Sequence, residues 1–138
     1  MNERHDLTAQ IRSWIGKAEN DFRNAEYVMT MEDDCPFDTV CFHCQQGAEK
    51  YLKALLIHHE IEFPRTHDLV PLLNFLCQKV DIPLEVEQGQ PLNRYSIEAR
   101  YPDDWYPIDR QEATHGMKLA RNVRDTVRRL MPKEVLEG

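Results

Sequence analysis

The fold is decided by residues 42–56, which read Phe-His-Cys-Gln-Gln-Gly-Ala-Glu-Lys-Tyr-Leu-Lys-Ala-Leu-Leu. Apolar and small residues recur here at steps of three and four, which is the spacing of a helix with a buried face. We predict a helix from Phe37 to about His59, with Asp38 as its N-cap. Small residues at 44, 47 and 48 would let a partner helix approach closely. The same helix carries the polar residues Gln45, Gln46, Glu49, Lys50 and Lys53.

Two other long stretches have the helical period. Apolar residues in the stretch 11–29 recur in steps of 4, 3, 4, 3 and 4, which predicts a helix over 7–31 that the following acidic segment and proline bring to an end. A second stripe over 113–130 predicts a last helix that is capped by Asp109 and ended by the next proline. The residues expected in the core include Phe22, Leu52 and Leu55.

Two shorter helices complete the pattern. Thr66 or Asp68 is expected to cap a helix over 69–80, and another helix is expected over 92–99. No segment shows convincing strand-like alternation, so the predicted fold class is all-α, an up-and-down bundle of about five helices. We assign residues 10–131 to the bundle, residues 1–9 to an N-terminal tail and residues 132–138 to a C-terminal tail.

The composition indicates a globular protein of one domain. The chain has 138 residues, of which 41% are hydrophobic and 30% charged. No apolar run approaches the roughly 18 residues that a membrane span needs, and the polar N-terminus lacks a signal-peptide core. We therefore expect a cytoplasmic protein that does not enter a membrane. The net charge is −7, although residues 118–133 hold six basic side chains and one acidic one, which leaves room for one localised anionic contact.

The four cysteines are expected to be reduced. Cys41, Cys44 and Cys77 occupy apolar positions of helical patterns, where free cysteine behaves as a small hydrophobe. Cys41 and Cys44 have the spacing of a zinc knuckle, but they would lie in mid-helix without a well-placed second ligand pair. Neither a metal nor another cofactor is expected.

Several polar residues are candidates for a binding groove. Gln46, Lys50 and Lys53 lie three or four residues apart, so they share one face of their helix. The alternative is a solvated face with a Glu49–Lys53 ion pair. His67 is either a proton carrier near neutral pH or a structural turn residue.

A second group of candidates follows the fourth predicted helix. Arg100, Tyr101 and Asp103 stand in an aromatic-rich loop. Guanidinium groups bind phosphate and aromatic rings stack on bases, as in a nucleotide or RNA site. The same residue types are also enriched in protein interfaces. A ligand site, an interface and a plain surface all remain open.

Residues 42–56, Phe63–Leu69 and Arg100–Asp103 together resemble the HEPN family of small helical proteins, often encoded beside minimal nucleotidyltransferases. The resemblance covers residues 10–131. It implies a helical bundle that forms one half of a two-component, toxin–antitoxin-like module with a nucleotidyltransferase partner. It also favours the interpretation that Gln46 and Lys50 line a polar groove that binds a nucleotide or RNA.

The resemblance suggests a catalytic alternative. Several HEPN branches are metal-independent ribonucleases with an Arg-x4–6-His motif, and Arg110 and His115 match that spacing. A chance match is the other interpretation, because this pair opens the last helix. We expect weak or no ribonuclease activity from the protein alone. The small residues at 44, 47 and 48 and the aromatic loop suggest a homodimer, and a non-catalytic dimeric scaffold is a further alternative.

Overall fold

The chain folds as a helical bundle, seen in a computed structural model that describes residues 2–84, 88–96 and 107–137, and the side chains from residue 6 on. The all-α prediction is confirmed, with six helices in the described part against about five predicted. The helices are α1 (Asn2–Met29), α2 (Phe37–His58), α3 (Leu69–Lys79), α4 (Gln90–Asn93), α5 (Arg110–Leu130) and α6 (Lys133–Leu136).

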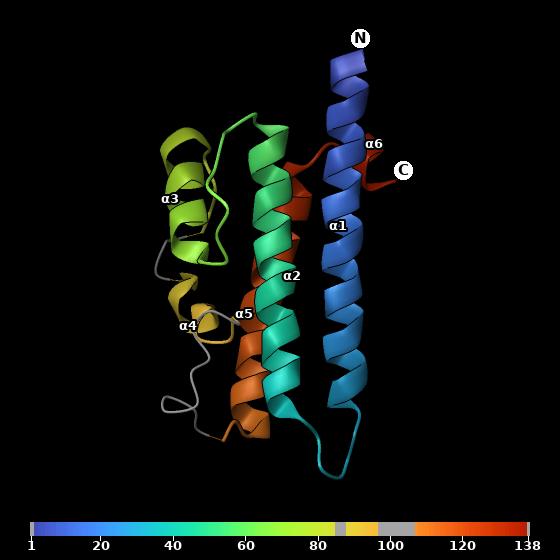
Figure 1. Cartoon of the computed structure of the whole chain (residues 1–138), viewed down its shortest axis with the longest axis vertical. Helices are drawn as coiled ribbons and strands as arrows, with labels where there is room; N and C mark the ends of the chain where they lie inside the picture. Colours follow the sequence, from blue (N-terminus) through green and yellow to red (C-terminus); the bar gives the residue numbers. More distant parts are fainter. Residues whose placement is uncertain (1, 85–87, 97–106, 138) are drawn as a thin grey trace.

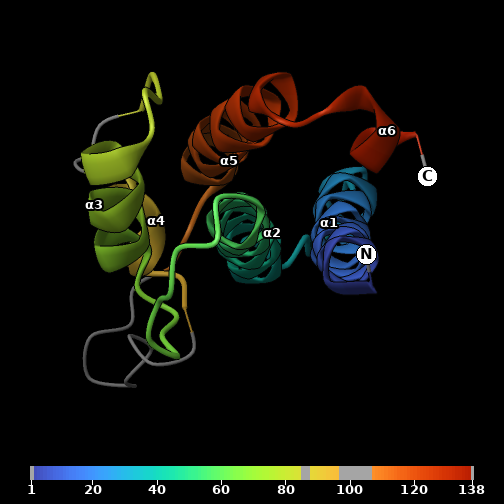
Figure 2. The same ribbon diagram turned by 90° about the horizontal axis from the view of Figure 1, so that it is seen from above.

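Helix α2 is the centre of the bundle. Figure 1 shows α1 and α3 on opposite sides of α2, and Figure 2, seen from above, shows α5 along a third side. The expected core residues Phe22, Leu52 and Leu55 are all buried. The predicted apolar stripe of α1 is likewise buried from Ile11 to Ala25. Because α2 is enclosed on three sides, its sequence pattern determines the arrangement of the other long helices.

The small residues of α2 serve packing inside the chain. A side-chain carbon built at Gly47 would meet the ring of Phe22 at 2.6 Å, so α1 approaches α2 closely at this level. Cys44 and Ala48 are fully buried. The predicted close approach is thus found, but the partner helix is α1 of the same chain. These residues therefore give no support to the expected dimer contact.

The helix ends are set by side-chain caps at two of the predicted positions. Asp68 accepts a hydrogen bond from the backbone N–H of Val70 and begins α3. Asp109 accepts one from the N–H of Glu112 and begins α5. The prediction for α2 was wrong, because Pro36 holds the N-cap position and Asp38 lies in the first turn.

Three boundaries differ from the predictions. Helix α1 begins at Asn2, inside the expected N-terminal tail. Helix α4 ends at Asn93, and residues 97–99 of the predicted helix lie outside the described part of the chain. The expected C-terminal tail contains α6, because Pro132 ends α5 and also occupies the N-cap position of α6. The Arg12 side chain donates to the carbonyls of Glu134 and Val135 and so ties α6 to α1.

The cysteines are all free, as predicted. Cys41 and Cys44 are buried between the helices, and burial raises the pKa of each thiol to about 12. The prediction for Cys77 was wrong, since its side chain is exposed at the surface of α3. The apolar stripe of α3 passes beside this position through Leu76.

Candidate functional site

The candidate site lies on the side of α2 opposite α5. Its residues are Gln45, Gln46, Glu49, Lys50 and Lys53, called below the polar face of α2. At about 100° per residue they cover roughly 140° of the helix circumference. The rest of the circumference is taken by helix contacts, since Tyr51 meets Arg128 of α5 and Gly47 meets Phe22 of α1. No described helix covers the remaining side (Figure 2).

One half of the polar face is a buried cluster around Glu49. The Glu49 carboxylate is 3% exposed and accepts hydrogen bonds from Lys53 Nζ at 3.1 Å and Gln45 Nε2 at 3.3 Å. His67 Nδ1 lies 3.1 Å from the same carboxylate. Lys53 also stands 5.5 Å from the ring centroid of Trp14, in cation–π geometry. Each charge in this cluster therefore has a partner.

The other half is organised by Asp21 of α1. Its two carboxylate oxygens meet His43 Nδ1 at 2.8 Å and Lys50 Nζ at 2.5 Å. Asp21 is buried, whereas the Lys50 and His43 side chains keep 21% and 23% of their surface exposed. A buried carboxylate thus fixes one ammonium and one imidazole at the surface of the bundle.

The structure divides the predicted groove residues between these two clusters. Lys53 and His67 both contact Glu49, and Gln46 is joined to that cluster through a 2.7 Å hydrogen bond from its Nε2 to Gln45 Oε1. Lys50 instead contacts α1. The Glu49–Lys53 ion pair expected on a solvated face is present, but it is buried.

Four members of these clusters were not among the predicted site residues: Asp21, His43, Gln45 and Glu49. Asp21 had a signal in the sequence, because it is a charged residue on the same face as the apolar residues Ala18 and Ala25. A carboxylate on an apolar stripe needs a buried partner. The second predicted group, formed by Arg100, Tyr101 and Asp103, lies outside the described residues.

The fold has a family counterpart. The profile of the HEPN domain matches residues 11–130 of this chain. The chain belongs to the HEPN family. Two solved structures are similar: TT1696 from Thermus thermophilus and ST0689, an archaeal HEPN homologue. No match was found among curated proteins.

The two similar structures match over most of their length. TT1696 is 29% identical, with a TM-score of 0.74 over 88% of this chain and 98% of that chain. ST0689 is 26% identical, with a TM-score of 0.66 over 86% of this chain and 94% of that chain. The helical arrangement is therefore shared along nearly the whole HEPN domain.

Arg110 and His115, the two residues of the expected ribonuclease motif, point to different surroundings. The Arg110 guanidinium donates to the carbonyls of Met29 at 3.1 Å and Met31 at 2.9 Å, and it stacks 4.9 Å from the ring centroid of Phe37. It thereby satisfies carbonyl groups at the C-terminal end of α1. His115 is exposed and lines a hollow of about 930 Å³ between α1 and α5.

The basic residues of α5 are largely paired with acids of α1. Arg124 binds both carboxylate oxygens of Glu19 at 2.8 Å, and Arg121 lies 3.1 Å from Glu26. The hydrogen bonds from Arg124 lower the pKa of Glu19. Burial raises the pKa of Tyr51, beside Arg128, to about 12. The excess positive charge expected to meet an external anion is therefore used in part to join two helices.

Proposed function

We propose that this HEPN protein is one component of a two-component, toxin–antitoxin-like module whose partner is a minimal nucleotidyltransferase. We also propose that the polar face of α2 is part of a nucleotide- or RNA-binding groove. Family membership supports the module. The observation that carries the groove is the pair of anchored, partly exposed side chains, Lys50 and His43, on one side of the bundle. An anionic ligand needs such groups to be held in place before it arrives.

Lys50 is the proposed phosphate contact. Its ammonium has three N–H donors, and the described contacts use one of them on Asp21. The remaining donors can turn to a ligand at the exposed part of the side chain. His43 stands beside it on the same carboxylate. Asp21 thus acts as the anchor that places a cation and an imidazole next to each other.

The proposed groove also includes Arg100, Tyr101 and Asp103. Arg100 would pair with a phosphate group and Tyr101 would stack on a base. Gln46, Lys53 and His67 would form the opposite side of the same groove, through the cluster around Glu49.

The groove is tested by calorimetric titration of the purified protein with ATP and with a short single-stranded RNA. Lys50→Ala should weaken binding about tenfold or more, because a hydrogen bond to a charged group contributes about 1.5–3 kcal/mol. Lys79→Ala, at the exposed end of α3, is the matched control and should bind like the parent. Equal binding by both variants would remove Lys50 from the site. The partnership is tested separately, by co-purification with a nucleotidyltransferase encoded beside this chain.

A ribonuclease that uses Arg110 and His115 is the alternative. The Arg110 contacts with Met29 and Met31 favour a structural role, and a catalytic one would require the guanidinium to leave these carbonyls. Cleavage of mixed RNA in the presence of a chelator, lost in His115→Ala, would establish the alternative.

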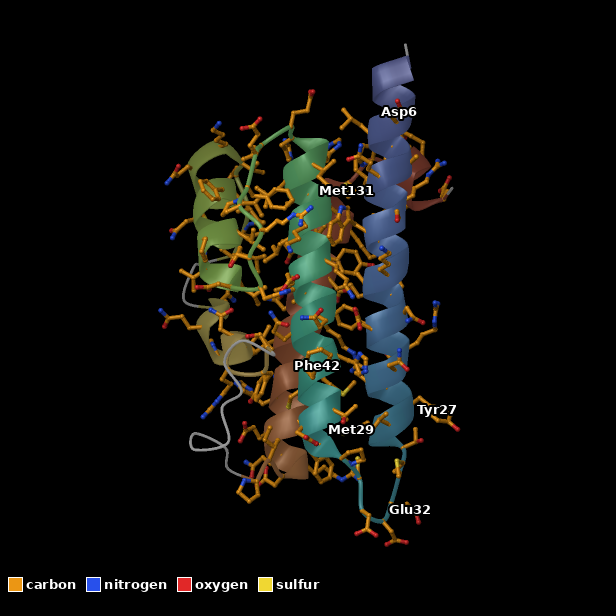
Figure 3. The ribbon with its side chains drawn as sticks, viewed as in Figure 1. Asp6, Tyr27, Met29, Glu32, Phe42 and Met131 are labelled. Carbon is orange, nitrogen blue, oxygen red and sulfur yellow. The ribbon has the colours of Figure 1, made fainter. Side chains whose placement is uncertain are left out.

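A homodimer remains part of the proposal, with a dimeric scaffold as its non-catalytic form. Two surface features support it: the hollow between α1 and α5, and Tyr27 of α1, which is 77% exposed. Figure 3 shows Tyr27 pointing away from the bundle. Large exposed aromatic residues are typical of interfaces. Light scattering that shows only the 16.3 kDa species at micromolar concentration would contradict the dimer.

Among the described helices, none has both the length and the apolar character needed to cross a bilayer.

A further inference from the structure

His67 is held at more points than a turn residue requires. Its backbone carbonyl accepts a hydrogen bond from Gln45 Nε2 at 2.8 Å, and its ring Nδ1 lies 3.1 Å from Glu49 Oε1. Its side chain is nevertheless 47% exposed, while that of Glu49 is 3% exposed. One edge of the ring is therefore fixed inside the protein, and the other is presented to the outside.

The contacts of Glu49 determine which ring nitrogen carries the proton. Lys53 and Gln45 both donate to the Glu49 carboxylate, so this group acts as an acceptor toward its surroundings. His67 Nδ1 must then be the donor in its contact with Glu49. A neutral imidazole with its proton on Nδ1 has a free lone pair on Nε2. In its neutral form the ring thus presents a hydrogen-bond acceptor at Nε2, on the edge turned away from Glu49.

The start of α3 does not depend on the His67 ring. The start of α3 is already capped by Asp68, and the N–H of Leu69 donates to Asn93 Oδ1 at 2.8 Å. A buried ion pair such as Glu49–Lys53 is often replaced by apolar residues without loss of stability. A buried carboxylate whose partners are a lysine, a glutamine and an exposed histidine is better explained by the histidine it orients.

We propose that His67 Nε2 accepts a hydrogen bond from a ribose hydroxyl of the bound nucleotide or RNA, and that Glu49 is the positioning residue that fixes the tautomer. This inference rests on the proposed groove. Phosphate oxygens are acceptors and would be repelled by a lone pair, whereas a sugar hydroxyl is a donor. Lys50 belongs to the cluster around Asp21 and His67 to the cluster around Glu49, so a phosphate contact and a sugar contact would lie on opposite sides of the proposed groove. The site therefore selects ribonucleotides over deoxyribonucleotides.

The selectivity is tested by titrating the protein with ATP, 2′-deoxy-ATP and 3′-deoxy-ATP. We expect ATP to bind about two- to tenfold more tightly than one of the deoxy analogues, because one hydrogen bond contributes a net of about 0.5–1.5 kcal/mol. His67→Ala should bind all three equally. His59→Ala, at the exposed end of α2, should keep the preference.

The outcomes separate the inference from the groove itself. Equal binding of the three nucleotides by the parent protein would refute the role of His67 and leave the groove intact. Absence of binding by ATP and by single-stranded RNA would refute both.

The role of Glu49 is tested without any ligand. Nitrogen-15 NMR of the imidazole rings should show His67 with its proton on Nδ1 and an unprotonated Nε2. The double variant Glu49→Leu/Lys53→Met removes both buried charges together, so that neither is left unpaired. In that variant the signal should move toward the Nε2–H form that free histidine prefers in water. An unchanged tautomer in the double variant would contradict the positioning role.

Discussion

Two glycines in helix interiors provide a matched test of the packing between α1 and α2. Gly16 lies on the exposed side of α1, and a side-chain carbon built there meets nothing within 4 Å. Gly47 lies in α2 against Phe22, where the added carbon would meet ring atoms at 2.6, 2.8 and 3.3 Å. Replacing each glycine with alanine makes the same chemical change in two different surroundings.

The expected free energies follow from these distances. Alanine is favoured over glycine by about 1 kcal/mol in a helix interior, so Gly16→Ala should stabilise the protein by that amount. Gly47→Ala receives the same gain, but it must displace the ring of Phe22, which is 4% exposed and packs against Tyr51 at a centroid distance of 6.0 Å. Inserting a methyl group into a packed core costs about 1–3 kcal/mol. Because the helix term cancels, the two variants should differ by this packing cost alone.

Urea unfolding followed by circular dichroism measures both free energies. The variants should show equal slopes against urea concentration and different midpoints. The further variant Gly47→Ala/Phe22→Leu should recover part of the loss, because it removes the ring that the methyl group meets. If Gly47→Ala were as stabilising as Gly16→Ala, the close contact between the two helices would be refuted.

Three other expectations concern charge and thiol chemistry. Lys53→Met should lower the free energy of unfolding by about 3–5 kcal/mol, since it leaves the buried carboxylate of Glu49 without its cation; a loss below about 1 kcal/mol in urea unfolding would contradict the buried pair. Glu19 stabilises the folded state above its ordinary pKa of 4.5, because its folded-state pKa is lowered chiefly by the hydrogen bond from Arg124. The destabilisation caused by Glu19→Gln should therefore be present at pH 7 and disappear as the pH falls through the lowered pKa, as measured by unfolding across that range. A thiol reagent should label exposed Cys77 quickly, and it should label the two buried cysteines of α2 only on unfolding. Because half-buried Cys35 can also react, rapid labelling of more than two thiols per native chain would show that the buried sites open.

The sequence was sufficient for the fold class and for the buried apolar stripes of the long helices. The 3-4 spacing of apolar residues in α1, α2 and α5 is a local property, and each stripe can be buried only against another helix. The caps at Asp68 and Asp109 were also predictable, because an N-cap contacts backbone groups two or three residues away. Helix α6 was missed because a four-residue helix has too little periodicity to detect, and its position depends on Arg12 at the other end of the chain.

The candidate site depended on tertiary structure for its pairings. Spacing placed Gln46, Lys50 and Lys53 on one face of a helix, but it could not show that Lys50 pairs with Asp21 while Lys53 pairs with Glu49. The Asp21 and His67 contacts join residues 29 and 18 positions apart, and such distances are closed only when α1 and the turn before α3 dock on α2. A helical sequence fixes which side chains share a face, whereas the neighbouring elements decide which of those side chains are buried, charged and held toward a ligand.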